Sequence, residues 1–493
     1  MHSRGWIWAW AGLAFSAAGS PLCAATLVKA RLLASVSTYH SKPGDPIEAL
    51  VAPPPCSESE TLPPGSVLSG RVQKVRKVGL GLIHETARMQ LAFDQLRLPD
   101  GRSYAVETRL VSVDNARERI DKNGAIHGIR ATNSLSSRLG SRIAIEVLEH
   151  PVHPFLLGPA LVLENGLFRF PDPEIEYGRG TELDLRVQIP SSAGIVSVCS
   201  ADGDESAASV RDLADGLPYW AWSKRQPQPM DLINLVFVGS RSELDAAFLA
   251  AGWTGAQRNS MSAGLTVVRA LAEDREFARA PMRTLLLDGD EPDVSMQSAL
   301  NSFEKRDHLR IWKRPEPSEG RTVWASSATR DLAATFSMGH PFGFTHEIEG
   351  NVDPERDKVV SDLQLTGCVD SVSYIARPQP PRDSAHEYRK GVHTDGRLAV
   401  VMLNDCRSPA VDFAGVSPEP PPAPAVRVFR RVSLTARNHF IRDNIVYRAA
   451  DDTRLGVRAL RGWYVRRHEE QRAEQEDARR ARPVETALSD GGE

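Results

Sequence analysis

Two histidines and a nearby group of carboxylates are the residues of this sequence best suited to chemistry. His308 and His346 lie in segments that both predict β-strands, and Glu349, Asp353 and Asp357 follow His346 within eleven residues. On adjacent strands, two imidazoles and a carboxylate would form a set that suits zinc, iron or manganese. The pattern predicts a divalent metal site at His308, His346 and Glu349. It also fits a hydrolase, with or without metal, in which His308, His346, Asp353 and Asp357 act.

The same region is open to two other interpretations. Arg310, Arg356 and Asp357 could form an ion-pair network that fixes a strand–helix junction, with Asp353 capping the helix. Alternatively, Arg310 and Arg356 could bind an anionic ligand at the N-terminus of a helix over 354–366, where backbone N–H groups point outward. Acidic residues in the first turn of that helix would repel an anion, so the ion-pair network is the favoured interpretation.

Complete catalytic signatures are absent from the sequence. There is no Gly-x-Ser-x-Gly elbow, no phosphate-binding loop and no dinucleotide fingerprint after a strand. His84-Glu85, His346-Glu347 and His386-Glu387 begin like a metalloprotease helix but lack its second histidine. This favours binding or assembly over catalysis.

The elements that must hold these residues follow from the local pattern. In the strand 345–350, His346 shares a face with Ile348, and Glu349 lies on the other face. Asp353 predicts a helix N-cap, Pro354 suits the first helical position, and Gly367 predicts the helix end.

The surrounding segments predict an α+β domain over 231–415, with one mixed sheet and packed helices. An apolar run at 232–239 reads as a strand buried on both faces. Ser242 is expected to cap the next helix, whose core face would use Leu244, Phe248 and Leu249. Further strands are expected at 308–312, 322–325, 344–349, 371–376 and 398–403.

The first half of the chain predicts a mostly β, barrel-like domain over 26–190. Apolar and polar residues alternate through 66–75 and again from Met89 to Phe93. Leu96 and Leu98 are out of step by one position, which predicts a β-bulge. A turn at 99–101 returns the chain as a hairpin.

The N-terminus, residues 1–25, reads as an export signal with Arg4, an apolar core and a small-residue end. This predicts a periplasmic or secreted protein without a transmembrane helix in the mature chain. Removal of the signal leaves Cys56, Cys199, Cys368 and Cys406, and the preferred disulfide joins Cys368 to Cys406.

Composition describes a soluble multidomain protein. The net charge of −3 over 493 residues gives no reason to expect nucleic acid or an anionic membrane as partner. The remaining segments are a linker at 191–230, a Pro-rich spacer at 416–425, an appendix at 426–465 and a charged, disordered tail at 466–493.

Several motifs in order resemble a known family. They are the apolar segment 234–239, the pair Gly252-Trp253, the strand 308–312, and the stretch from Thr345-His346 to Asp357. Together they resemble the LssY C-terminal domain family over about 231–405. The resemblance implies a fold and no settled activity. Glu349 stands where the family more often has aspartate.

The N-terminal half more weakly resembles exported TrbI-like β-barrel modules of conjugation channels, through a Gly-Arg-Val strand and the segment 97–102. The sequence therefore predicts an exported binding or assembly module whose partner is a cell-envelope protein or polymer. The alternative is the histidine-based hydrolase.

Overall fold

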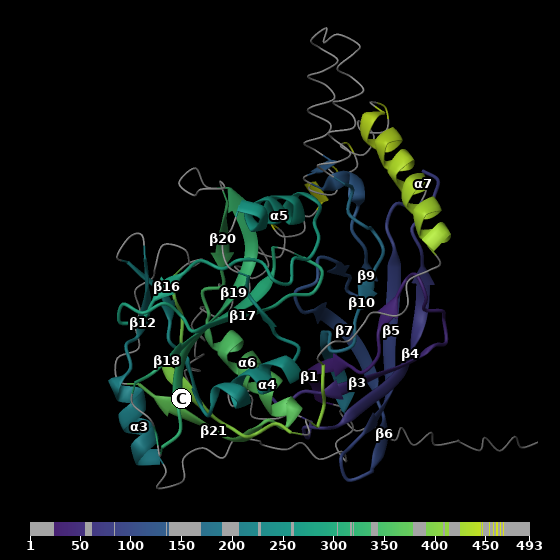
Figure 1. Ribbon diagram of the computed structural model, residues 1–493. Coiled ribbons are helices and arrows are strands. Elements are labelled where there is room, and N and C mark those ends of the chain that lie inside the picture. The colour runs from purple at the N-terminus through teal and green to yellow at the C-terminus, as the bar shows by residue number, and fades with distance from the viewer. Residues whose placement is uncertain are drawn as a thin grey trace, which may run out of the picture. The chain divides into compact units, whose positions relative to one another are not determined.

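The computed structural model shows a strand-rich protein, with an antiparallel, barrel-like sheet in its first half and a mixed sheet in its second (Figure 1). It describes the chain except for a set of segments: 1–23, 55–61, 83, 135, 138–168, 190–206, 225–227, 258–260, 303, 316–317, 319, 337–343, 378–390, 408–409, 414–423, 445, 447–452, 454–456, 458–459, 462–463, 465–466 and 468–493. Cys56, Cys199 and most of the predicted signal, spacer and tail lie outside the described residues.

The first sheet is antiparallel and barrel-like, as the alternating pattern predicted. In the described residues its strands run in the order β7-β11-β1-β3-β4-β5-β9-β8, with β6 on β5. Thr108 Oγ1 on β7 bonds both the N–H and the C=O of Phe93 on β5, which brings the edge strand β7 back to β5 and curves the sheet. The bounds are β1 Ala24–Leu32, β3 Pro46–Val51, β4 Val67–Arg76, β5 Arg88–Arg97, β6 Ser103–Ala105, β7 Glu107–Val113, β8 Arg119–Ile120, β9 Ala125–His127 and β11 Glu182–Ile189; β2 Val36–Ser37 and β10 Glu176–Tyr177 form a separate pair.

The expected β-bulge is present in β5. Gly70 pairs with Phe93 and Ser69 with Gln95, so Asp94 is the extra residue. Met89, Leu91, Phe93, Leu96 and Leu98 are all buried, because the bulge returns the two leucines to the inner face. A Cβ on Gly70 would lie 2.0 Å from the carbonyl oxygen of Ala92, so this close approach of two backbones requires glycine.

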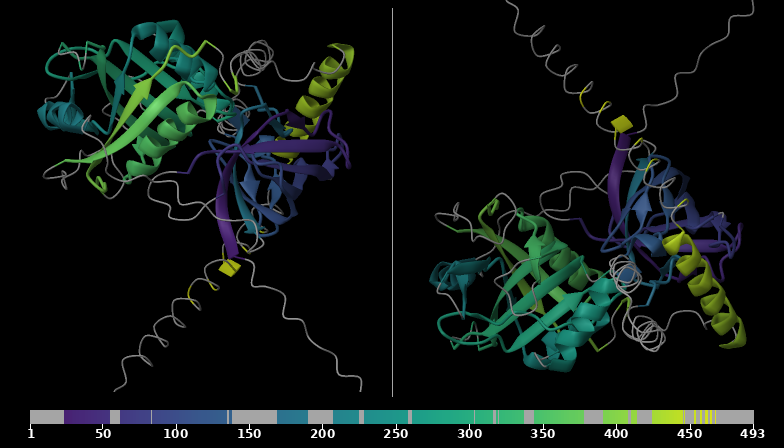
Figure 2. Two further views of the ribbon diagram at one scale, coloured as in Figure 1. Left: turned by 90° about the horizontal axis from the view of Figure 1, so that it is seen from below. Right: turned by 90° about the horizontal axis from the view of Figure 1, so that it is seen from above.

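The second sheet is mixed, as predicted. Its order is β15-β17-β18-β19-β14-β22-β21, with β20 on β19, and β14 pairs with β22 in parallel. Helices α4 and α6 pack on one face, and a small sheet β13-β12-β16 packs on the other (Figures 1 and 2). The bounds are α3 Ala207–Gly216, β12 Trp220–Ser223, β13 Pro229–Leu232, β14 Leu235–Val238, α4 Arg241–Ala250, β15 Thr254–Gly255, α5 Met261–Ala272, β16 Leu285–Leu286, β17 Val294–Ser298, β18 Arg306–Lys313, β19 Val323–Phe336, β20 Phe344–Ile348, α6 Asp353–Thr366, β21 Val369–Ala376 and β22 Arg397–Leu403.

Several local expectations need correction. Ser240, not Ser242, caps α4, because its hydroxyl accepts from the N–H of Glu243 in a capping box. Leu249 is 59% exposed and so lies outside the core face of α4. The stretch expected as a linker contains α3, β12 and β13. The strand expected at 322–325 extends to Phe336.

By its contacts the chain divides into two compact units. The larger holds both main sheets. The smaller comprises residues 79–85, 130–170 and 423–493, and its described elements are the 3-10 turn Ala131–Asn133 and the helix α7, Pro424–Asp443.

Candidate functional site

The hairpin β18–β19 presents chemistry on both of its faces. Along β18, Arg306, His308 and Arg310 alternate with Asp307, Leu309 and Ile311. Successive residues of a strand point to opposite faces. Leu309 and Ile311 join the core beneath α4 and α6, so Arg306, His308 and Arg310 lie on the far face.

On that far face, the two predicted histidines come together around an aspartate. Asp331 Oδ2 on β19 lies 3.4 Å from His308 Nε2 and 3.1 Å from His346 Nδ1. The two imidazole rings are 6.4 Å apart, edge to face. Arg306, which pairs with Asp331 across the ladder, places its guanidinium 3.4 Å from that carboxylate. We call Arg306, His308, Asp331 and His346 the histidine cluster.

Burial sets the protonation of this cluster. It lowers the pKa of His308 well below its usual value, with the charges of Arg306 and Arg310 acting in the same direction, so this ring is neutral. Burial also raises the pKa of Asp331 to about 6, against the opposing effect of Arg306. At neutral pH the carboxylate is therefore ionised and balances the guanidinium of Arg306.

The tautomer of His346 follows from its arginine neighbour. Arg306 Nη2 lies 3.1 Å from His346 Nε2. A guanidinium can only donate, so this ring nitrogen accepts. A neutral ring then carries its proton on Nδ1, the nitrogen that faces Asp331.

These residues do not fit the predicted metal ion. The lone pair of His346 Nε2 is directed at a guanidinium, and a cation beside Arg306 would be repelled. Glu349 donates its N–H to the carbonyl of Arg330, while Asp331 is the carboxylate beside both histidines. Within the described part of the chain, no group of three His, Cys, Asp or Glu residues is arranged to hold a metal.

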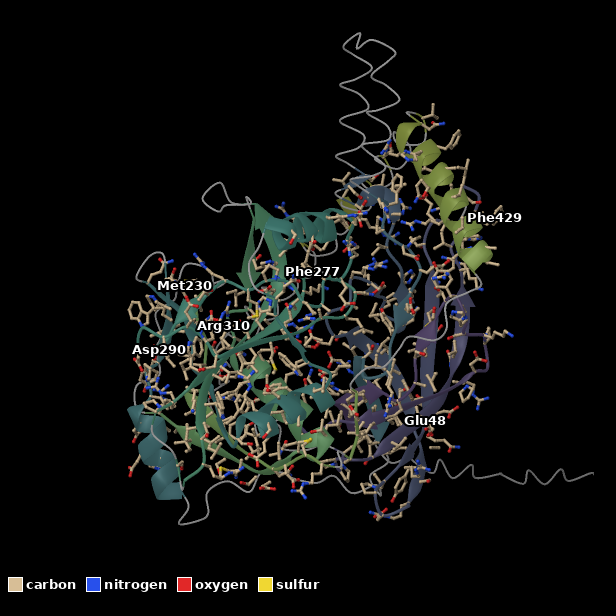
Figure 3. All side chains as sticks on the ribbon, in the orientation of Figure 1. Glu48, Met230, Phe277, Asp290, Arg310 and Phe429 are labelled. Atoms are coloured by element: carbon tan, nitrogen blue, oxygen red, sulfur yellow. A yellow bond between two sulfur atoms is a disulfide. The ribbon has the colours of Figure 1, made fainter. Side chains whose placement is uncertain are left out.

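Arg310 is engaged elsewhere on the same face (Figure 3). Its guanidinium bonds the buried carboxylate of Asp231, and its Nε donates to the carbonyl of Arg283 at 3.1 Å. Arg310 and Arg356 therefore belong to separate clusters and do not form one anion site.

Arg356 lies at the start of α6, where carboxylates surround it. Its guanidinium is fully buried and bonds Asp395 at 2.8 Å, Asp357 at 2.8 Å and Asp353 at 3.4 Å, and it also donates to the carbonyl of Arg397. Asp357 also accepts from the hydroxyl of Tyr374. These contacts have the form of the ion-pair network favoured from the sequence, without Arg310.

The expected N-cap at Asp353 is wrong. The N-cap residue is Val352, which offers no side-chain bond. Asp353 is the first helical residue, and its carboxylate instead accepts from Thr394 Oγ1 at 2.8 Å and from the N–H of Asp395 at 2.6 Å. The carboxylate therefore fixes the loop before β22 to the helix start. The expected helix end is confirmed, since Gly367 has φ +75°.

The other face of the β18–β19 hairpin, which is directed toward α4 and α6, carries a second cluster of buried polar residues. Lys358 Nζ on α6 lies 3.0 Å from Glu182 and 3.5 Å from Asp114. Glu182 begins β11 of the barrel-like sheet, and Asp114 follows β7 of the same sheet. Arg330 on β19 pairs with Asp114, and Asn115 Nδ2 donates to Asp307 at 2.7 Å. The set, which we call the ion network, comprises Lys29, Arg31, Asp114, Glu182, Asp307, Arg330, Glu355, Lys358 and Asp362.

Two carboxylates of the ion network hold their protons more tightly than usual. Burial, with nearby Asp114, raises the pKa of Asp307 to about 7. Burial also raises the pKa of Glu355 well above its usual value. In contrast, Lys29, Lys358 and Arg31 lower the pKa of Glu182 against the effect of its burial. Protonation thus offsets the excess of carboxylates over cations in this network.

Sequence reasoning missed Arg306, Asp331 and the whole ion network. A signal for Asp331 exists, since Ser327, Thr329 and Asp331 alternate with other residues along one face of a longer strand than expected. No comparable local signal marks Lys358, because a lysine near the start of a helix reads as a solvated residue.

The predicted cysteine pair is adjacent in the structure. A disulfide joins Cys368 to Cys406, with their Cα atoms 4.7 Å apart. It ties the end of α6 to the chain after β22.

The fold and its polar hairpin define a mixed α+β domain, and most of this domain is similar to a known protein family. Residues 218–398 match the family described as LssY C-terminus. The match contains the histidine cluster and confirms the resemblance predicted from the sequence. No curated protein matches the chain.

Proposed function

We propose that this protein is a non-catalytic binding or assembly module of the cell envelope. The observation that carries the proposal is that most of the residues suited to chemistry are buried and lie in contact with one another. Arg306 and Asp331 are each 2% exposed, His308 is 7% exposed, and Arg356 is surrounded by carboxylates. Groups in this state hold packed junctions together.

The state of His346 also argues against general base catalysis. A general base must present its lone pair within hydrogen-bond reach of the substrate proton. In this structure Nε2 of His346 accepts from Arg306, and Nδ1 faces Asp331. Both ring nitrogens are therefore directed at protein groups.

Export supports the envelope location in this proposal. Residues 1–25 have the pattern expected of an export signal, and β1 begins at Ala24, close to the predicted cleavage position. The Cys368–Cys406 disulfide suits an oxidising compartment such as the periplasm. In the described residues, no helix has the length and apolar character needed to span a membrane.

One observation favours the hydrolase as a second candidate. Asp331 contacts two histidines, and the side chain of His346 is 23% exposed. A carboxylate that orients an imidazole is a recurring part of nucleophilic sites. In this alternative, Arg306 would have to release His346 when substrate binds.

The His346→Ala variant separates the two candidates. We expect wild type purified from the periplasm to hold no stoichiometric metal and to hydrolyse no chromogenic ester or phosphomonoester. We expect His346→Ala to melt earlier, with a free energy of unfolding lower by about 1–2 kcal/mol. The measurements are metal analysis, hydrolysis assays and thermal unfolding.

His127→Ala is the matched control, because His127 is also partly exposed and lies 2.9 Å from an aspartate, Asp121, in the barrel-like sheet. A metal or a hydrolytic turnover that is present in wild type and His127→Ala but lost in His346→Ala would refute the non-catalytic proposal.

A further inference from the structure

Helix α7 turns its apolar stripe outward. Val428, Phe429, Val432 and Phe440 are 61%, 65%, 62% and 54% exposed. Phe429 is labelled in Figure 3. They recur at the three- and four-residue spacing of one helical face, with Ala425 and Ala436 on the same stripe. We call these six residues the outer face of α7. In a helix of a globular domain this face would ordinarily be buried.

The opposite side of α7 is held within the smaller unit. Leu434 and Ile441 are buried. Arg437 bonds the carbonyl of Gly79, and the ring of His439 packs edge to face on Phe170 at 5.0 Å. The helix is therefore anchored through a side that includes its polar residues, and its outer face is directed away from that anchorage.

The helix and the sequence after it are strongly basic. Residues 424–467 contain eleven arginines and three aspartates, a net charge of +8 in a protein whose overall charge is −3. Arg427 and Arg431 are exposed on α7. Beyond α7, four apolar residues at helical positions are also highly exposed: Val446, Val457, Leu460 and Tyr464. The net charge of the whole chain does not reveal this local excess of positive charge.

We propose that the outer face of α7 docks on an anionic lipid surface, with Phe429 and Val432 inserted at the headgroup boundary and with the charges of Arg427 and Arg431 attracting the helix to the anionic surface. Exposed apolar residues on one side of a basic amphipathic helix are the physical requirements for interfacial binding, and arginines near an anionic leaflet add electrostatic attraction. This site is separate from the histidine cluster, and the inference goes beyond the proposed function.

A second copy of the chain fits this face less well than lipid does. Two segments of charge +8 would repel each other on pairing. The charge complementarity therefore favours an anionic bilayer.

Vesicle flotation of the purified full-length mature protein tests the proposal. We expect wild type to float with vesicles of phosphatidylethanolamine and phosphatidylglycerol, and to bind phosphatidylcholine vesicles about tenfold more weakly. The double variant Phe429→Ser/Val432→Ser should lose about tenfold in binding to the anionic vesicles. Arg427→Gln/Arg431→Gln should lose a similar factor and show a weaker dependence on salt.

Leu249→Ser is the matched control, because Leu249 is an equally exposed apolar residue on α4. It should bind vesicles as wild type does. Circular dichroism and the melting temperature must show that every variant is folded.

Three results would overturn the proposal. The first is equal binding to phosphatidylcholine and anionic vesicles. The second is full binding by the folded Phe429→Ser/Val432→Ser variant. The third is absence of flotation together with a solution dimer, or with binding to a DNA duplex, that the same variant abolishes. Such a result would assign the face to a second copy or to nucleic acid.

Discussion

The two faces of the β18–β19 hairpin differ in how far their contacts reach along the chain. On one face, the histidine cluster joins residues 306 to 346, all within the family match. On the other, the ion network joins α6 and the hairpin to β1, β11 and the turn after β7. Because successive strand residues point to opposite faces, one hairpin contacts residues of its own domain on one face and residues of the barrel-like sheet on the other.

The chemistry of the two faces differs as well. The histidine cluster balances one ionised carboxylate with one guanidinium beside two histidines. The ion network packs more carboxylates than cations and has two carboxylates with raised pKa. The comparison suggests that the ion network stabilises the association of the two domains, and that the histidine cluster stabilises the sheet edge.

Lys358→Met should have the largest effect, because it leaves Glu182, Asp362 and Asp114 without their shared ammonium group. Removal of one partner from a buried ion network lowers the free energy of unfolding by about 3–5 kcal/mol. Urea unfolding followed by tryptophan fluorescence measures the loss. Lys224→Met is the control, since Lys224 and Glu291 form an exposed pair worth ~0–1 kcal/mol. Equal losses in the two variants would contradict an ion network that stabilises the domains.

Asp307→Asn should reveal the raised pKa on the ion-network face. The folded protein keeps this proton to about pH 7, while the unfolded chain releases it near pH 3.8. The folded state therefore binds more protons in this window, and the stability contributed by Asp307 falls as the pH rises from about 4 to about 7. Relative to Asp307→Asn, the free energy of unfolding of wild type should fall by up to ~4 kcal/mol across this window and then show no further change. Urea unfolding of both proteins at each pH unit from 4 to 8 measures the difference, and a constant difference would show that the pKa is not raised.

Asp331→Asn should reveal a pH dependence of the stability on the histidine-cluster face that is smaller and spans a narrower pH range. The pKa of Asp331 is raised to about 6, a shift in the same direction as that of Asp307. The stability contributed by Asp331 therefore falls as the pH rises from about 4 to about 6, and does not change further above pH 6. The expected change relative to the variant is up to ~3 kcal/mol. The same urea series measures it. If the difference instead continued to change up to pH 7 or beyond, the contrast between the two faces would be lost.

The fold could be predicted wherever a local pattern carries the information. Alternation located β4, β5 and the bulge at Asp94, and the apolar run located β14. Positions that depend on a partner were less predictable. Ser242 and Asp353 both look like N-caps, but the caps are Ser240 and Val352, because the choice depends on where the preceding strand or loop ends.

The candidate site shows the same limit. His308 and His346 were expected to meet on neighbouring strands. Their strands β18 and β20 both pair with β19 and not with each other, so that expectation is wrong, although the two rings still come together. The ion network could not be predicted, because Lys358 and Glu182 are 176 residues apart and Arg31 and Asp362 are 331 apart. No periodicity in the sequence connects residues at such distances.

The position of Arg31 has a consequence for the order of folding. Arg31 lies on β1, near the start of the chain, and its guanidinium pairs with Asp362 on α6, while β1 itself pairs with β11. During synthesis, this cation emerges from the ribosome long before either partner. Closure of such a long loop makes assembly slow. The barrel-like sheet must therefore remain incomplete until β11 arrives, and Arg31 must remain hydrated until α6 has folded. We expect early intermediates in which the first strands are still open to chaperones and proteases.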